Sequence, residues 1–214
     1  MSVASTKAFT GQLAALACFT IALGRARGTV SAAEEQAFVE DLSRVPAQVA
    51  DVLEASSDIK GIARQLAGVD NAIYIGRGAS YPIALEGALK LKELCYIHAE
   101  GYAAGELKHG PLALLDHNVP VIALAPPDTL FEKIASNVQE VAARGAPIVL
   151  VSSRRGVEQV DDSAEMSIVL PDCSGLATPI VYSIPLQLLA YYTAVLRDVD
   201  VDRPRNLAKS VTVE

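Results

Sequence analysis

The sequence has fewer basic than acidic side chains, and this imbalance limits the partners that the protein can bind. Lysine and arginine total 18 against 25 aspartates and glutamates, so the net charge is −7, and the isoelectric point is about 5.0. Binding to nucleic acid or to an anionic membrane requires a basic surface. We therefore expect neither partner, and an anionic ligand would need a local cluster of cations or backbone N–H groups.

Cysteine is scarce and tryptophan is absent. The three cysteines are scattered along the chain and form no CxxC pair: Cys18, Cys95 and Cys173. This pattern predicts free, mostly buried thiols in a reducing compartment rather than a disulfide framework. The histidines have no spacing typical of metal ligands: His98, His109 and His117. We expect no metal site and no other cofactor.

The chain lacks a recognisable targeting signal and a long hydrophobic run. Residues 2–7 contain no basic segment followed by an apolar one, as a secretory signal would. The most apolar stretch, residues 13–24, is interrupted by Thr20 and is shorter than the roughly 20 residues that span a bilayer. These observations predict a soluble, cytoplasmic protein without a membrane partner.

Apolar residues make up 51% of the chain, enough to bury a substantial core, and the first third has the pattern of helices alone. One helix is predicted over residues 5–27. Ser31 and Glu34 have the spacing of a capping box that opens a second helix. Pro46 should end this second helix at the preceding residue and open a third one. A fourth, short helix is predicted over residues 58–67.

From about residue 71 onward, short apolar runs alternate with helical segments. Four runs are predicted as buried strands: residues 72–75, 119–125, 147–151 and 166–170. Three helices follow the pattern of caps and prolines: residues 82–96, residues 129–145 with a capping box at 129–132, and residues 179–197. Apolar strands that alternate with helices indicate a parallel sheet covered on both faces. We predict an α/β fold, a three-layer αβα sandwich with a mostly parallel, doubly wound sheet, preceded by helices.

Three charged residues of the predicted helix 82–96 recur on one of its faces. Glu86, Lys90 and Glu93 are spaced i, i+4 and i+7, which places them side by side. A carboxylate next to an ammonium group can act as a general base whose pKa is set by that neighbour. The alternative is a solvated helix face with an ordinary Glu–Lys pair.

Three other segments are candidates for ligand binding. Residues 76–80 form a glycine-containing turn between a strand and a helix, which either presents backbone N–H groups to an anion or is a simple tight connection. Residues 98–111 are predicted as a long loop that carries His109, a residue type that can move protons. Residues 203–210 are the most basic stretch, either a solvated terminus or an arm whose lysine forms a Schiff base with a carbonyl substrate.

Four segments together resemble one known family over essentially the whole chain. They are residues 3–9 (VASTKAF), 87–93 (GALKLKE), 103–111 (AAGELKHGP) and 204–214 (PRNLAKSVTVE). The family is glutamine:fructose-6-phosphate aminotransferase (isomerising), also called glucosamine-6-phosphate synthase. Its members join a glutaminase domain to two sugar-isomerase (SIS) domains, and this sequence is similar to the end of the first SIS domain and the whole second one.

The resemblance implies roles for four residues in a ketose–aldose isomerisation. Glu93 matches the base that moves a proton between C1 and C2, and Lys90 orients and tunes it. His109 matches the histidine that opens the sugar ring in the site of the neighbouring subunit, which implies a homodimer. Lys209 matches the lysine that forms a Schiff base with the ketose.

The resemblance also implies a substrate site and a division of the chain. Val3, Ser5 and Ala208 match positions that contact the sugar phosphate, and Glu86 matches a carboxylate near the site. The expected parts are residues 1–68 as the helical remnant of the first SIS domain with connecting helices, residues 69–198 as the second SIS domain, and residues 199–214 as the tail with the active-site lysine.

Two expected features of the family are missing from this sequence. Residue 2 is serine, so no cysteine nucleophile of a glutaminase begins the chain, and the Ser/Thr-rich loop that holds the sugar phosphate is absent. We therefore expect this chain to be nearly inactive by itself and to depend on the glutaminase domain of a full-length protein. Two alternatives are an SIS module that binds a phosphosugar without turnover and a related sugar-phosphate isomerase or deglycase.

Overall fold

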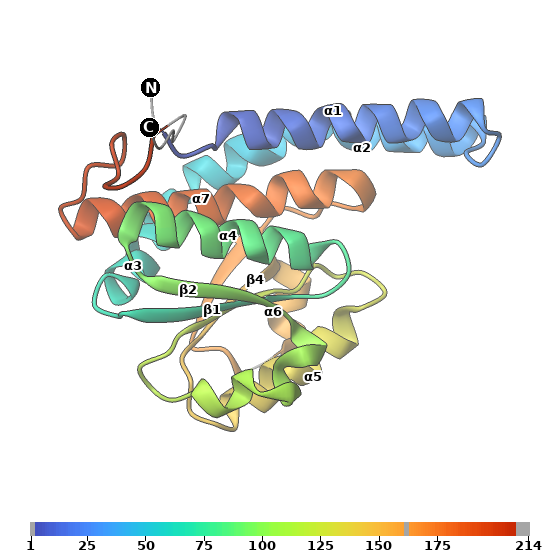
Figure 1. Cartoon of the computed structure of the whole chain (residues 1–214). Coiled ribbons are helices and arrows are strands. Elements are labelled where there is room, and N and C mark those ends of the chain that lie inside the picture. Colours follow the sequence, from blue (N-terminus) through green and yellow to red (C-terminus); the bar gives the residue numbers. More distant parts are fainter. Residues whose placement is uncertain (1–2, 161–162, 209–214) are drawn as a thin grey trace.

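The computed structural model describes residues 3–160 and 163–208, and it contains a single five-stranded parallel sheet covered by helices on both faces (Figure 1). The strands lie in the order β2-β1-β3-β4-β5. Their bounds are β1 Asn71–Gly76, β2 His98–Ala103, β3 Val121–Leu124, β4 Ile148–Ser153 and β5 Met166–Leu170. All four neighbouring pairs are parallel. The predicted three-layer α/β fold is therefore confirmed.

Two hydrophobic cores lie on the two faces of the sheet. The first core packs the sheet against α3 (Ser56–Leu66), α4 (Ser80–Cys95) and α7 (Thr178–Leu196). The second packs it against α5 (Phe131–Ala142) and α6 (Arg154–Val160), together with the 3-10 helices η1 (Ala104–His109) and η2 (Pro111–Leu114). A further 3-10 turn, η4 (Gly175–Ala177), leads into α7. Figure 1 shows the two helical layers above and below the sheet.

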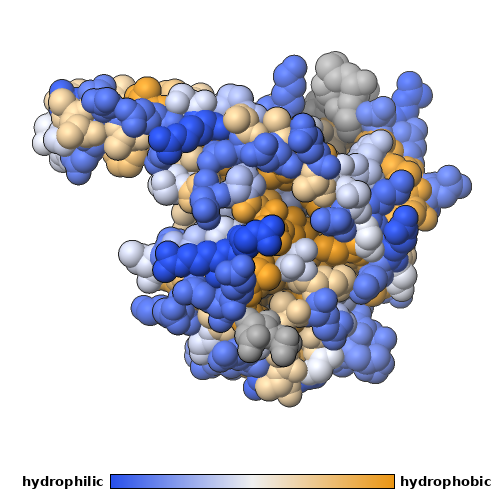
Figure 2. Space-filling model, turned by 180° about the vertical axis from the view of Figure 1, so that it is seen from behind, coloured by the Kyte–Doolittle hydropathy of each residue, from blue (hydrophilic) through white to orange (hydrophobic). Residues whose placement is uncertain are grey.

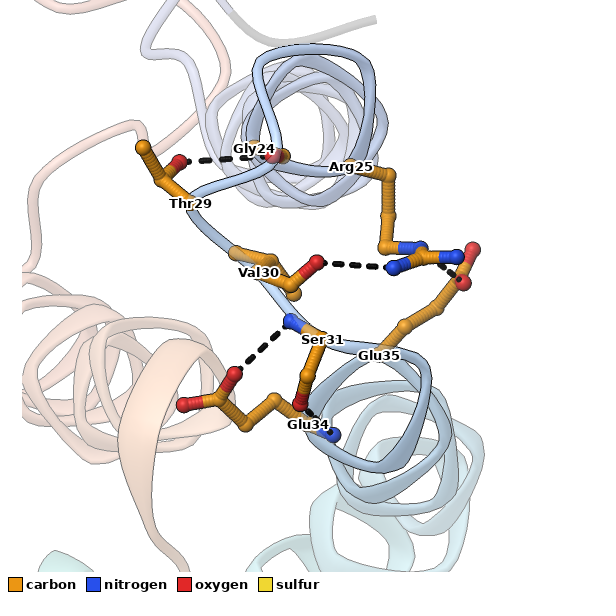
Figure 3. Close-up of polar contacts among 7 residues, drawn as sticks. All are labelled: Gly24, Arg25, Thr29, Val30, Ser31, Glu34 and Glu35. Carbon is orange, nitrogen blue, oxygen red and sulfur yellow. Dashed lines mark hydrogen bonds and ion pairs between the residues drawn. The ribbon is translucent and has the colours of Figure 1, made fainter.

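The first two helices form a long arm beside this sandwich. They are α1 (Lys7–Ala26) and α2 (Ala32–Glu54), joined by a short turn. In Figure 2, seen from behind, one end of the arm stands clear of the body. The predicted capping box closes this turn: the Glu34 backbone N–H donates to Ser31 Oγ (3.2 Å), and the Ser31 N–H donates to Glu34 Oε2 (2.8 Å; Figure 3). An ion pair between Arg25 and Glu35 (2.7 Å) ties the two helices together at the same place.

Two segments pass the length and hydropathy thresholds for a membrane span, by composition alone. They are Lys7–Ala26 and Gly175–Leu196, both with a mean hydropathy of 1.3. The second is 56% buried within the sandwich and is a core helix, whereas the first is 17% buried. The first is longer than the apolar stretch of residues 13–24, because polar residues on both sides of that stretch are also helical.

Pro46 does not end a helix, contrary to the prediction. The α2 helix runs through it from Ala32 to Glu54. Contacts on both sides of the proline hold the helix against the domain: Ser174 Oγ donates to Asp41 Oδ2 (2.7 Å), and Gln48 Nε2 donates to the Asp172 carbonyl (2.8 Å). Proline removes one backbone donor and bends a helix, but packing on each side of it can outweigh that cost.

The predicted loop over residues 98–111 is also wrong. Residues 98–103 form the edge strand β2, and residues 104–109 form η1. The strand could not be recognised from the sequence, because its small residues, and Gly101 above all, are typical of loops. In the structure, a Cβ at Gly101 would lie 2.9 Å from the Leu85 Cα atom, so the glycine permits β2 to pack tightly under α4.

The capping box predicted at residues 129–132 does not form. Helix α5 begins at Phe131, and its N-cap residue Leu130 makes no side-chain capping bond. Instead, Asp128 Oδ1 accepts a hydrogen bond from the Leu130 backbone N–H (2.7 Å). An aspartate two residues earlier is the better local acceptor, since Asx turns of this kind compete with a capping box.

Candidate active site

The charged face of α4 is assembled as its spacing predicts. Lys90 is 2% exposed, although lysine is rarely buried without a partner. Its ammonium group contacts Glu93 Oε2 and lies 3.6 Å from Glu86 Oε1. The two carboxylates are more accessible than the lysine, with side chains 13% exposed for Glu86 and 23% for Glu93. Two carboxylates thus share one buried cation, which is more than a solvated ion pair.

Burial also changes the pKa of one of these carboxyl groups, that of Glu86. Burial raises the pKa of Glu86 above its ordinary value, an effect that the neighbouring Lys90 ammonium partly offsets. Lys90 cannot be removed without leaving two carboxylates facing each other in a poorly hydrated place. The structure therefore keeps the Glu93 carboxylate next to a fixed positive charge while leaving one side of it open.

The open side of Glu93 faces a hollow of about 470 Å³. One wall is the last turn of α4, and another is the C-terminal tail. The lining residues from the tail are Arg205, Asn206 and Leu207. The tail therefore passes across the hollow just before it reaches Lys209, which lies outside the described residues. Of the predicted site residues that the structure describes, Glu93 is the one that lines this hollow.

Tyr96 fastens the tail to α4. It follows the last residue of the helix in a left-handed conformation, with φ of 57°. Its hydroxyl oxygen accepts a hydrogen bond from the Arg205 backbone N–H (2.7 Å), and the Arg205 guanidinium carbon lies 4.1 Å from the centre of the ring. A guanidinium stacked on an aromatic face is an attractive contact. The sequence alone does not reveal this pair, because no local pattern joins residues 109 positions apart.

The N-terminal segment lies beside the same tail. The Val3 backbone N–H donates to the Asp202 carbonyl (3.3 Å), and Val3 is half-buried. Ser5 and Ala208 are both exposed. The predicted substrate-contacting positions of the two chain ends are thus in one region of the molecule. Their contacts with a substrate stay predictions.

His109 lies away from Glu93. It is the last residue of η1, which packs with the core on the opposite face of the sheet from α4. Its side chain is 74% exposed, and its nearest carboxylate oxygen is Glu106 Oε2 at 3.9 Å. Within one copy of the chain, the structure does not bring His109 into the hollow beside Glu93.

No group of three or more metal-ligating side chains occurs in residues 3–160 and 163–208. The cysteines of this part of the chain are unpaired, and burial raises the pKa of Cys95 to about 12 and that of Cys173 to about 11. These two shielded thiols are inert packing groups, whereas Cys18 is exposed. Packing alone explains the glycine at position 76 in the turn after β1, because a Cβ there would collide with the Ser80 backbone.

Comparisons with known proteins place most of the chain in one family. A family profile described as "SIS domain" matches residues 65–197. The chain is also similar along its entire length to a protein of Brucella abortus biovar 1 named glutamine–fructose-6-phosphate aminotransferase [isomerizing], with 54% identity over 214 residues. A protein of Bradyrhizobium diazoefficiens with the same name is also 54% identical over 214 residues. The chain spans 35% of the length of each of these relatives, and it corresponds to their C-terminal part.

A solved structure has the same fold over nearly all of the chain. It is the C-terminal domain of glucosamine-fructose-6-phosphate aminotransferase from Francisella tularensis, with a TM-score of 0.92 and 43% sequence identity. The match covers 95% of this chain and 57% of that one.

Proposed function

This chain belongs to the SIS domain family, and from that premise we propose that it forms part of an enzyme that makes glucosamine 6-phosphate from fructose 6-phosphate and glutamine. The step assigned to this chain is the isomerisation of the ketose to the aldose. The observation that carries the proposal is the Glu93 carboxylate, held against the buried Lys90 ammonium and facing a hollow bounded by the tail.

The arrangement suits a proton transfer between neighbouring carbons. A Schiff base between the Lys209 amine and the C2 carbonyl of the ketose, formed with loss of water, acidifies the C1 hydrogens. Ammonia then displaces the lysine amine and leaves an imine at C2 of the sugar. Glu93 takes a proton from C1 of this imine and returns it to C2, while the C1 hydroxyl proton passes to the imine nitrogen. A C1 aldehyde and a C2 amine result, and Glu93 begins and ends as a carboxylate. Lys90 forms an ion pair with this carboxylate and limits its rotation. The tail contacts at Tyr96 support this role, since they bring the residues before Lys209 to the hollow.

We propose that His109 opens the sugar ring in the site of a second copy of the chain. A ring-opening group must accept a proton from one ring substituent and donate one to the ring oxygen, which an imidazole can do near neutral pH. The exposure of His109 and its distance from the Glu93 face of the same copy support a shared site in a homodimer.

The helical arm fits a place in a longer polypeptide. Large apolar side chains stand exposed on α1: Leu16, Phe19 and Leu23 are 44–62% exposed. We propose that residues 1–68 complete a first SIS domain and its connection to the second, and that ammonia comes from a glutaminase domain of the same polypeptide. We assign the protein to the cytoplasm, which the unpaired cysteines of the described residues support.

The test is made on the full-length polypeptide with fructose 6-phosphate. We expect formation of glucose 6-phosphate without glutamine and of glucosamine 6-phosphate with it. Borohydride should trap the sugar on Lys209, and mass spectrometry should locate it there. Lys209→Arg should abolish trapping, whereas the matched variant Lys133→Arg, on the exposed side of α5, should not. Tight binding of the sugar without turnover or trapping would instead indicate a binding module.

A further inference from the structure

A chain of polar side chains connects the turn after β1 to the segment that carries His109. Arg77 Nη1 donates a hydrogen bond to Asn137 Oδ1 (2.8 Å), and Asn137 Nδ2 donates to Glu140 Oε2 (3.4 Å). Lys108 Nζ forms an ion pair with Glu140 Oε1 (2.8 Å). Asn137 is 5% exposed, so this amide is buried with both of its polar atoms paired. The connection runs across α5, from the turn after β1 to η1.

The Arg77 guanidinium also lies directly against η1. A Cβ added to Gly105 would be 3.2 Å from Nη1 and 3.3 Å from Nη2 of Arg77. A side chain at position 105 would therefore be in tight contact with the guanidinium, which would have to shift by a few tenths of an ångström. The 3-10 helix is held near its beginning by Arg77 and near its end by Lys108.

The direction of His109 follows from the direction of Lys108. Successive residues of a 3-10 helix point about 120° apart, because the helix has three residues per turn. Lys108 reaches back to Glu140 on α5, and Leu107 is fully buried in the core below the sheet. The remaining direction is outward, and the His109 side chain is accordingly 74% exposed.

We propose that Arg77, Asn137, Glu140 and Lys108 are positioning residues that fix η1 so that His109 is presented outward in one orientation. This inference rests on the proposed function, because it assigns the four residues to the group that opens the sugar ring. None of them touches the Glu93 hollow in the same copy. Lys108 lowers the pKa of Glu140 through its hydrogen bond, which agrees with an ionised pair at neutral pH.

The test combines each variant with His109→Ala in the full-length enzyme. Lys108→Gln and Asn137→Ala should each reduce kcat for fructose 6-phosphate about tenfold, since small displacements of a catalytic group are costly. In the His109→Ala background the same changes should reduce kcat less than about twofold, because the group they position is gone. Lys108→Arg, which keeps the ion pair, should retain activity. Lys133→Gln is the matched control for Lys108→Gln, because it makes the same change at an exposed lysine on α5.

The outcomes separate the inference from the proposed function. Equal losses of kcat in both backgrounds would overturn the positioning role, even with His109→Ala itself impaired. A fully active His109→Ala enzyme would refute the proposed role of His109 and the inference with it. Asn137→Ala should also lower the melting temperature by a similar amount in both backgrounds, so a loss of stability cannot imitate the expected result. Lys108→Gln changes a side chain that is 58% exposed and keeps the test valid if Asn137→Ala fails to fold.

Discussion

Glu93 and His109 are both proposed to carry protons, yet the structure treats them in opposite ways. Glu93 is built into a site: its carboxylate contacts a buried lysine and lines a hollow. His109 stands on the surface of another face, where its nearest carboxylate oxygen is 3.9 Å away. A base that removes a carbon-bound proton needs a fixed, partly dry setting. A side chain that acts in the site of a neighbouring copy must instead extend outward from the surface of its own chain. The contrast supports the proposal that Glu93 acts within its own chain and that His109 acts in the site of a second copy.

The largest expected effect comes from removing the Glu93 carboxylate. Glu93→Gln keeps the shape of the side chain and the contact with Lys90, but the amide cannot accept the C1 proton. We expect kcat for isomerisation to fall about a thousandfold. Isothermal titration should show that the sugar phosphate still binds. The exposed Glu158→Gln on α6 is the control, and unchanged turnover in Glu93→Gln would refute the assignment of the base.

Removing the buried cation should cost stability rather than chemistry alone. Lys90→Met leaves the Glu86 and Glu93 carboxylates without their shared partner, and breaking a buried pair in this way costs about 3 kcal/mol. Urea denaturation measures this change, with Lys60→Met on the exposed side of α3 as the control. The corresponding change at the other region, His109→Ala, should leave the free energy of unfolding within about 0.5 kcal/mol of the wild type. If Lys90→Met and the wild type had equal free energies of unfolding, the proposed difference between the buried Glu93 site and the exposed His109 would be contradicted.

The smallest expected effect is a pH dependence of stability that arises from Glu86. Burial raises the pKa of this carboxyl in the folded state above its unfolded value. The folded protein thus holds the proton more tightly, so the contribution of Glu86 is fully present below the unfolded pKa and is lost as the pH rises through the folded pKa. Glu86→Gln cannot ionise. Relative to wild type it should therefore gain stability as the pH rises above the ordinary glutamate value of 4.5, measured by urea denaturation at each pH. If the difference in free energy of unfolding between Glu86→Gln and the wild type were the same at every pH, the raised pKa of Glu86 would be contradicted.

The sequence was sufficient for the regular parts of this molecule. Helical periodicity placed Glu86, Lys90 and Glu93 on one face, and alternating apolar runs indicated the parallel sheet. It was insufficient where the outcome depends on distant contacts. Small residues at the edge of the sheet concealed β2, and the packing that carries α2 through Pro46 comes from residues near the start of α7.

The same limit applies to the candidate site. The contact of Tyr96 with Arg205 and the connection of Arg77 to Lys108 through α5 each join segments that are far apart in the sequence. No local pattern encodes such pairs. The exposure of His109 likewise became visible only in the fold, because a histidine between lysine and glycine has no periodic neighbours from which its direction could be predicted.

The most direct test of the account mixes two impaired forms of the full-length enzyme. Glu93→Gln and His109→Ala chains, carrying different tags, are produced together so that hybrid dimers form, and fructose 6-phosphate isomerisation is measured. If His109 serves the neighbouring site, each hybrid has one intact site, and a random mixture should recover about a quarter of wild-type activity. If His109 serves its own chain, every site in the hybrid carries one defect. Activity of purified hybrids well above that of both parents supports the shared site, and hybrids no more active than their parents would contradict it.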